Sequence, residues 1–106
     1  MMRTHGTELG DRFEIEIDGA PAGVAQFLDQ EGRRIFFHTQ IDDAYACHGL
    51  AGQLVAEALD ATRATGLRVV PVCPYVKRFL AKHEEYADLA DPVTPEAIRL
   101  VEQLTS

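Results

Sequence analysis

The chain has 106 residues, which is the length of one domain and enough for a hydrophobic core of its own. Its formal net charge of −7 argues against a general nucleic-acid binder and against docking on anionic lipid, because both need a basic surface. The acidity mildly favours a cationic partner such as an amine, although most acidic proteins are simply soluble. No apolar run approaches the length of a membrane span.

Cysteine and histidine usage also limits the function. The two cysteines, Cys47 and Cys73, do not make a disulfide framework, and no secretory signal is recognisable. We therefore expect a cytoplasmic protein. No CxxC pair occurs and the four histidines are scattered, so we expect no metal site.

The first half of the chain predicts an antiparallel meander of three strands. Residues 1–12 are polar without a period and are expected to form a loose arm. Apolar and charged residues alternate over 13–17, and two further strands are expected over 22–28 and 33–41. In the third strand, one face is expected to hold Ile35, Phe37, Thr39 and Ile41, and the other Phe36, His38 and Gln40.

The second half predicts helix, strand and helix. Apolar residues recur at helical spacing over 48–65, and Gly66 follows where a helix often ends. Residues 67–72 are typical of a strand covered on both faces, and Pro71 predicts an unpaired edge near its end. A second helix is expected over 74–83. The expected core positions of these two helices are Leu50, Leu54, Val55, Ala58, Leu59, Thr62, Val76, Phe79 and Leu80.

The C-terminal part predicts a short coil over 84–91 and an extra helix. Thr94 and Pro95 suit the cap and the first position of that helix, which is expected to extend to Leu104. Ile98, Val101 and Leu104 are expected to face the core. The fold class is therefore α/β, with a single domain over residues 1–106.

The chain contains four short motifs: His38-Thr39-Gln40-Ile41, Ala46-Cys47-His48-Gly49-Leu50-Ala51, Val69-Val70-Pro71-Val72-Cys73-Pro74-Tyr75 and His83-Glu84-Glu85-Tyr86. In this order they resemble the motifs of the minimal single-domain members of the GNAT superfamily of acyl-CoA-dependent N-acetyltransferases. The resemblance covers residues 13–89. It implies a minimal GNAT-like fold and transfer of an acetyl group from acetyl-CoA to an amine, such as an amine on a protein or peptide.

The resemblance also implies a cofactor site around the start of the first helix. Backbone N–H groups there would bind the coenzyme A phosphates, although tight packing of the helix on the sheet explains the same small residues. Arg78 and Lys82 share a helix face that would meet the adenosine phosphates or remain a solvated surface. The full set of implied cofactor-binding residues is Ile41, Ala46, Cys47, His48, Gly49, Leu50, Ala51, Gly52, Cys73, Arg78 and Lys82.

Three residues are candidates for the chemistry. Cys73 would lie beside the thioester, as a nucleophile or as part of the pocket wall, or it is a buried small hydrophobe. His38 is the candidate base for the amine, or a surface histidine. Tyr75 would supply the proton for the leaving thiol, or it belongs to the core.

The chain departs from the motifs of the resembled family at four positions. Gln40 stands where an acidic residue is expected and Glu84 where a proline is expected, and the other two departures lie in the loop before the first helix. Ala46 stands where an arginine or glutamine is usual, and Cys47 stands where a glycine is usual. These changes motivate an alternative function, a non-catalytic module that binds coenzyme A or a protein on a GNAT fold. A redox sensor using Cys47 or Cys73 is a third, weaker alternative. The acceptor amine and the oligomeric state do not follow from the sequence.

Overall fold

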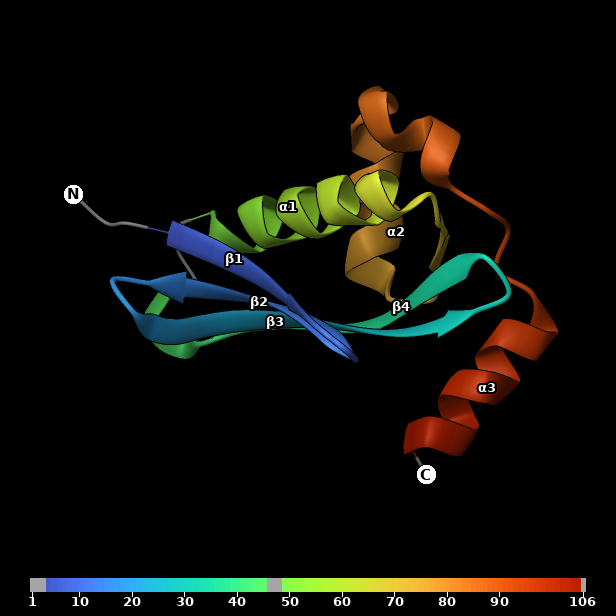
Figure 1. Ribbon diagram of the computed structural model, residues 1–106, viewed down its shortest axis with the longest axis horizontal. Helices are drawn as coiled ribbons and strands as arrows, with labels where there is room; N and C mark the ends of the chain where they lie inside the picture. The colour runs from blue at the N-terminus through green and yellow to red at the C-terminus, as the bar shows by residue number, and fades with distance from the viewer. Residues whose placement is uncertain (1–3, 46–48, 106) are drawn as a thin grey trace.

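The computed structural model describes residues 4–45 and 49–105, which form one mixed five-stranded sheet with helices on both faces (Figure 1). The strands are β1 (Thr4–Leu9), β2 (Arg12–Ile17), β3 (Ala20–Gln30), β4 (Arg33–Ile41) and β5 (Arg68–Pro71), and they lie side by side in this order. The helices are α1 (Leu50–Thr65), α2 (Pro74–Lys82) and α3 (Pro95–Thr105), with 3-10 turns at η1 (Asp43–Tyr45) and η2 (Glu84–Leu89). The predicted meander and α/β class are confirmed.

The N-terminal segment is a strand rather than the expected loose arm. β1 pairs antiparallel with β2, from Thr4 opposite Ile17 to Leu9 opposite Arg12. Its side chains are exposed or half-buried, so its sequence carries no apolar alternation to reveal it. Backbone pairing therefore forms this edge strand. An ion pair of 2.6 Å between Glu8 and Arg34 of β4 supports it.

A β-bulge overturns the expected faces of β4. Gln26 pairs with His38, but the next residue, Phe27, pairs with Phe36, which leaves Phe37 as an extra residue. A bulge of one residue reverses the alternation of side chains on either side of it. Phe36 therefore shares the α1 side of the sheet with Ile41, and Ile35 does not. The predicted face of Ile35, Phe37, Thr39 and Ile41 was wrong as a set.

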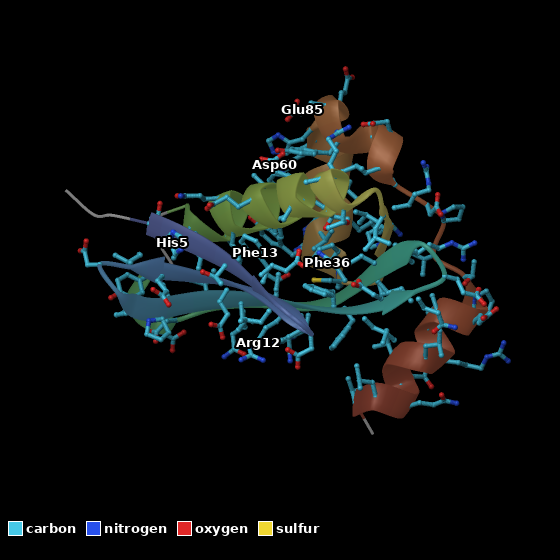
Figure 2. The ribbon with its side chains drawn as sticks, in the orientation of Figure 1. His5, Arg12, Phe13, Phe36, Asp60 and Glu85 are labelled. Carbon is cyan, nitrogen blue, oxygen red and sulfur yellow. The ribbon has the colours of Figure 1, made fainter. Side chains whose placement is uncertain are left out.

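Helix α1 packs along the sheet as predicted. All six expected core positions are buried: Leu50, Leu54, Val55, Ala58, Leu59 and Thr62. Gly66 ends the helix with φ 80°, a left-handed conformation that glycine adopts without strain. Figure 2 shows Phe13 of β2 and Phe36 of β4 pointing into the layer between the sheet and α1. This layer is the main core of the protein.

Strand β5 is covered on both faces, as its apolar run predicts. Val69 belongs to the core beneath α1, and Val70 belongs to a second cluster with Ile35 and Ala97 of α3. β5 is parallel to β4, and its pairing stops where Pro71 lies opposite Phe36. β4 continues to Ile41, so its second half has no partner in β5. The expected unpaired edge is confirmed.

Helix α2 buries Val76, Phe79 and Leu80, as expected. It is followed by the 3-10 turn η2, where the sequence predicted a coil. None of the helices in the described ranges is long and apolar enough to cross a bilayer.

Helix α3 lies across the sheet from α1 and near one end of it (Figure 1). The predicted cap is confirmed, because the Ala97 N–H donates to Thr94 Oγ1 at 3.1 Å. Two of its three expected core residues are wrong: Ile98 and Leu104 are 41% and 55% exposed. The small Ala97 instead makes the close approach and is only 5% exposed. Apolar residues occur on adjacent faces of this helix, so spacing alone could not select the buried one.

Over β2, β3 and the second half of β4, none of the described helices lies on the sheet surface turned away from α1, and we call this surface the open face (Figure 1). Arg12, which precedes Phe13, points away from α1 in Figure 2. Two cross-strand rows lie on this face because neighbouring strand residues alternate. The rows are Arg12–Gln26–His38 and Glu14–Val24–Gln40.

Truncating a buried and an exposed leucine tests this assignment of the core. Leu59→Ala should lower the free energy of unfolding by about 2–5 kcal/mol, because it leaves a cavity beneath α1. Leu104→Ala should change it by less than about 0.5 kcal/mol, because that side chain is largely in water. Urea unfolding of both variants measures the difference. Equal losses would contradict the placement of α3.

Candidate functional site

The start of helix α1 offers backbone donors that have no partner within the helix. Gly49 precedes the helix in the left-handed conformation, with φ 67°, and makes no side-chain cap. The first N–H groups of a helix have no partner within it and carry partial positive charge. Leu50, Ala51 and Gly52 provide these groups here. The predicted ligands Ala46, Cys47 and His48 lie outside the described residues.

A cavity of about 190 Å³ lies where α1 begins and α2 passes it. It brings together four of the predicted site residues, Gly52 of α1 and Tyr75, Arg78 and Lys82 of α2. Phe79 and His83 complete its lining. We call it the basic cavity, because Arg78 and Lys82 are cationic and no acidic side chain is among its lining residues.

Glycine at position 52 keeps this cavity open. A Cβ on Gly52 would lie 3.8 Å from the Tyr75 hydroxyl and 4.0 Å from Phe79 Cε2. These are ordinary contacts, so the helix tolerates a side chain there, but a longer one would fill the cavity. A multiply charged anion such as a phosphate ester would suit this site, because helix N–H groups and two cations can bind it and Gly52 leaves space for it.

His83 was assigned no contact by the sequence, and the structure gives it two. Its ring stacks on Phe79 with the centroids 4.0 Å apart, and its Nδ1 lies 3.2 Å from Glu85 Oε1. The stack makes a flat wall for the basic cavity. The four-residue spacing of Phe79 and His83 in a helix was the available signal.

Turn η2 holds this end of α2 against α1. The Tyr86 hydroxyl donates to Asp60 of α1 at 2.9 Å, and burial followed by this hydrogen bond raises the pKa of Tyr86. Arg63 donates to Asp88 at 2.7 Å and lowers the pKa of that carboxyl. Tyr86 therefore packs against the end of the helix, as its motif suggested, and holds α2 and the basic cavity in place relative to α1. Figure 2 labels Asp60 of α1 and Glu85 of η2 in this region.

Cys73 lies at the junction of β5 and α2, where β4 and β5 stop pairing. It is 4% exposed, and its N–H donates to the Phe36 carbonyl at 2.8 Å. Its Sγ is 3.4 Å from Thr39 Oγ1 of the unpaired half of β4. Sequence reasoning did not propose Thr39. Its contact with Cys73 depends on its position after the bulge in β4, and the sequence does not reveal the bulge.

His38 lies on the opposite face of β4 from this contact. Adjacent strand residues alternate, and Thr39 reaches Cys73, so His38 projects onto the open face. It is exposed, and its Nε2 is 3.3 Å from Gln40 Oε1. The structure therefore does not bring His38 and Cys73 together on one surface. Ile41 is half-buried on the α1 side of the same strand end.

No group of three or more histidine, cysteine or carboxylate side chains that could hold a metal occurs within 4–45 and 49–105.

Comparisons with known proteins agree with this arrangement. The family model described as GCN5-related N-acetyl-transferase matches residues 12–89. Protein NATD1 of Bos taurus is 28% identical over 74 residues, which is 68% of this chain. The match spans 66% of that relative, just under two thirds of its length.

The fold has a solved counterpart. An NMR solution structure of a GCN5-like protein from Staphylococcus aureus superposes with a TM-score of 0.65 and 16% identity, covering 86% of this chain and 91% of that one. This likeness supports the fold, and the family model covers most of the chain, from β2 to the end of η2. The chain belongs to the GCN5-related N-acetyltransferase (GNAT) family.

Proposed function

We propose that the protein is an N-acetyltransferase that uses acetyl-CoA and acetylates an amine. The observation that carries the proposal is the basic cavity at the start of α1, lined by Gly52, Arg78 and Lys82. Coenzyme A carries a pyrophosphate and a further phosphate, and this chain of formal charge −7 gathers cations at this cavity. Membership of the family supplies the class of reaction.

The residues present fit the cofactor. The N–H groups of Leu50, Ala51 and Gly52 would bind the pyrophosphate, and Arg78 and Lys82 would pair with the remaining phosphate charge. These donors replace the long side chain that Ala46 lacks. Backbone donors do not depend on residue type, so the departures at positions 46 and 47 leave this part of the site intact.

The unpaired half of β4 supports the place of the reaction. Backbone groups between Phe36 and Ile41 have no partner in β5, so an extended amide chain could pair with them as a strand does. Cys73 and Thr39 lie beside that edge. Bound acetyl-CoA would supply a thioester whose carbonyl carbon is the electrophile.

His38 is the proposed proton acceptor for the amine. An imidazole nitrogen can accept a proton from an amine, and that of His38 is exposed on the open face beside Gln40. It would take the proton that the amine loses as its nitrogen bonds to the acyl carbon. The Tyr75 hydroxyl lies beside Gly52 in the cavity proposed for the phosphates, so the leaving thiolate would take its proton from solvent rather than from Tyr75.

Cys73 is proposed as part of the wall, and direct transfer as the mechanism. The thiol is nearly fully buried and already contacts Thr39, whereas an acyl-accepting nucleophile must reach the thioester. Its N–H is also committed to the Phe36 carbonyl. The covalent route remains the competing mechanism, and acetylated Cys73 in an intact-mass spectrum during turnover would establish it.

A second candidate function is a module that binds coenzyme A without turnover. It is favoured by Ala46 and Cys47, which replace residues usual in the resembled family. Binding of acetyl-CoA without acetylation of any amine in a broad peptide library would favour this function over catalysis.

Filling the basic cavity tests the cofactor site. Gly52→Leu should weaken acetyl-CoA binding by at least about tenfold, because the side chain occupies the space between α1 and Tyr75. The fold should be kept or stabilised, since leucine is a better helix former than glycine by about 1 kcal/mol. Calorimetry gives the affinity, and thermal unfolding checks the fold.

The matched control is Gly52→Ala, whose Cβ makes only ordinary contacts. It should keep acetyl-CoA affinity within about threefold, because it leaves most of the volume free. An unchanged affinity in Gly52→Leu would show that the cofactor binds elsewhere or not at all.

Removing the proposed base tests the chemistry separately from binding. His38→Gln should lower kcat by about 10²–10³-fold at neutral pH and leave acetyl-CoA affinity unchanged, since the side chain is on the open face. His5→Gln is the control, because His5 is an exposed histidine on β1. Equal rates for both variants would remove His38 from the mechanism.

A further inference from the structure

The open face of the sheet contains a hollow whose charge is opposite to that of the basic cavity. It has a volume of about 290 Å³ and lies near the end of the sheet where β3 begins and β4 ends. Val24 and Pro21 give it an apolar floor, and Glu14, Gln40 and Asp42 give it polar walls. No lysine, arginine or histidine is among its lining residues. We call it the acidic hollow.

The hollow keeps a net negative charge although the cation Arg12 lies next to it. Arg12, in the adjacent row of the open face, donates to Glu14 at 2.8 Å and also to Asp11 at 2.7 Å. Two carboxylates therefore share one guanidinium, and the three side chains keep one net negative charge. Among the described residues, no cation lies within ion-pair distance of the Asp42 carboxylate, which accepts the Ala44 N–H at 3.0 Å.

The acidic hollow adjoins the strand end where the proposed reaction would occur. Gln40 lines it, and Gln40 Oε1 is 3.3 Å from Nε2 of His38, the proposed base. On the other side of the same strand, Thr39 contacts Cys73. A cationic group held in the hollow would thus lie close to the proton acceptor, and the anionic cofactor would be held at the start of α1.

We propose that the open face docks a peptide with neighbouring lysines, one lysine being held by the acidic hollow while another is presented for acetylation. Acetylation of the second lysine rests on the proposed function, whereas docking of the first lysine does not. Charge complementarity selects a cationic segment. The uncovered sheet face over three strands suits an extended peptide, because its polar side chains Gln26, His38 and Gln40 offer hydrogen bonds along it.

The test uses the full chain and two double variants of equal charge. Glu14→Gln with Asp42→Asn neutralises the hollow and keeps an oxygen acceptor for Arg12 and for the Ala44 N–H. Glu31→Gln with Glu102→Gln neutralises two exposed carboxylates away from the hollow. Both pairs raise the formal charge by two, from −7 to −5. Any difference between them therefore reports position and not bulk charge.

The probe is a blocked peptide with two lysines, compared with an analogue in which both are norleucine. Binding is followed by NMR shifts of the protein, with and without desulfo-CoA. The lysine peptide should shift Val24 and Gln40 and bind about fivefold more weakly to the hollow variant, with the control pair within about twofold. The norleucine analogue should bind much more weakly than the lysine peptide.

Two results would overturn the docking proposal. One is an absence of lysine-dependent shifts on the open face, with or without desulfo-CoA. The other is an equal loss of affinity in both double variants. Acetyl-CoA affinity, measured separately in each variant, distinguishes this failure from failure of the proposed function. Peptide binding without acetyl-CoA binding would support the docking and refute the enzyme, and the reverse result would do the opposite.

Discussion

The early end of β5 is the constraint on which the rest of the site depends. Pro71 has no N–H for the ladder, and the Val72 N–H turns back to the Val70 carbonyl at 3.1 Å. The Cys73 N–H then bonds to Phe36, which directs the chain into α2 at Pro74. β4 is left to continue alone to Ile41. An unpaired strand half, a helix start and a buried thiol meet there because one strand stops after four residues.

Charge is distributed so that each face of the sheet suits a different partner. On the α1 and α2 side, Arg78 and Lys82 line a cavity together with Gly52 of α1, and on the open face Glu14 and Asp42 line a hollow. This separation would keep the proposed cofactor and the proposed acceptor from competing for the same groups.

Much of the fold follows from the sequence because it rests on local patterns. The period of α1 selected all six of its buried residues, and Pro71 signalled the unpaired edge. The wrong predictions concern features that are determined by contacts between elements far apart in the sequence. β1 has no buried face, so its sequence shows no apolar alternation. The bulge at Phe37 depends on the register of β4 with β3. Ala97 rather than Ile98 is buried because it contacts the second apolar cluster. The basic cavity was predicted in part, since Arg78 and Lys82 share a helix face. Thr39 and the acidic hollow were not predicted, because both depend on the faces that the bulge sets.

The most direct test of this account is calorimetric titration of the purified protein with acetyl-CoA, with desulfo-CoA and ATP as comparisons. The account predicts micromolar binding of acetyl-CoA, similar binding of desulfo-CoA and much weaker binding of ATP, because the site would recognise the pantetheine arm as well as phosphate. Absence of binding at millimolar acetyl-CoA would contradict it and would mean that the α1 start and the basic cavity do not form a cofactor site.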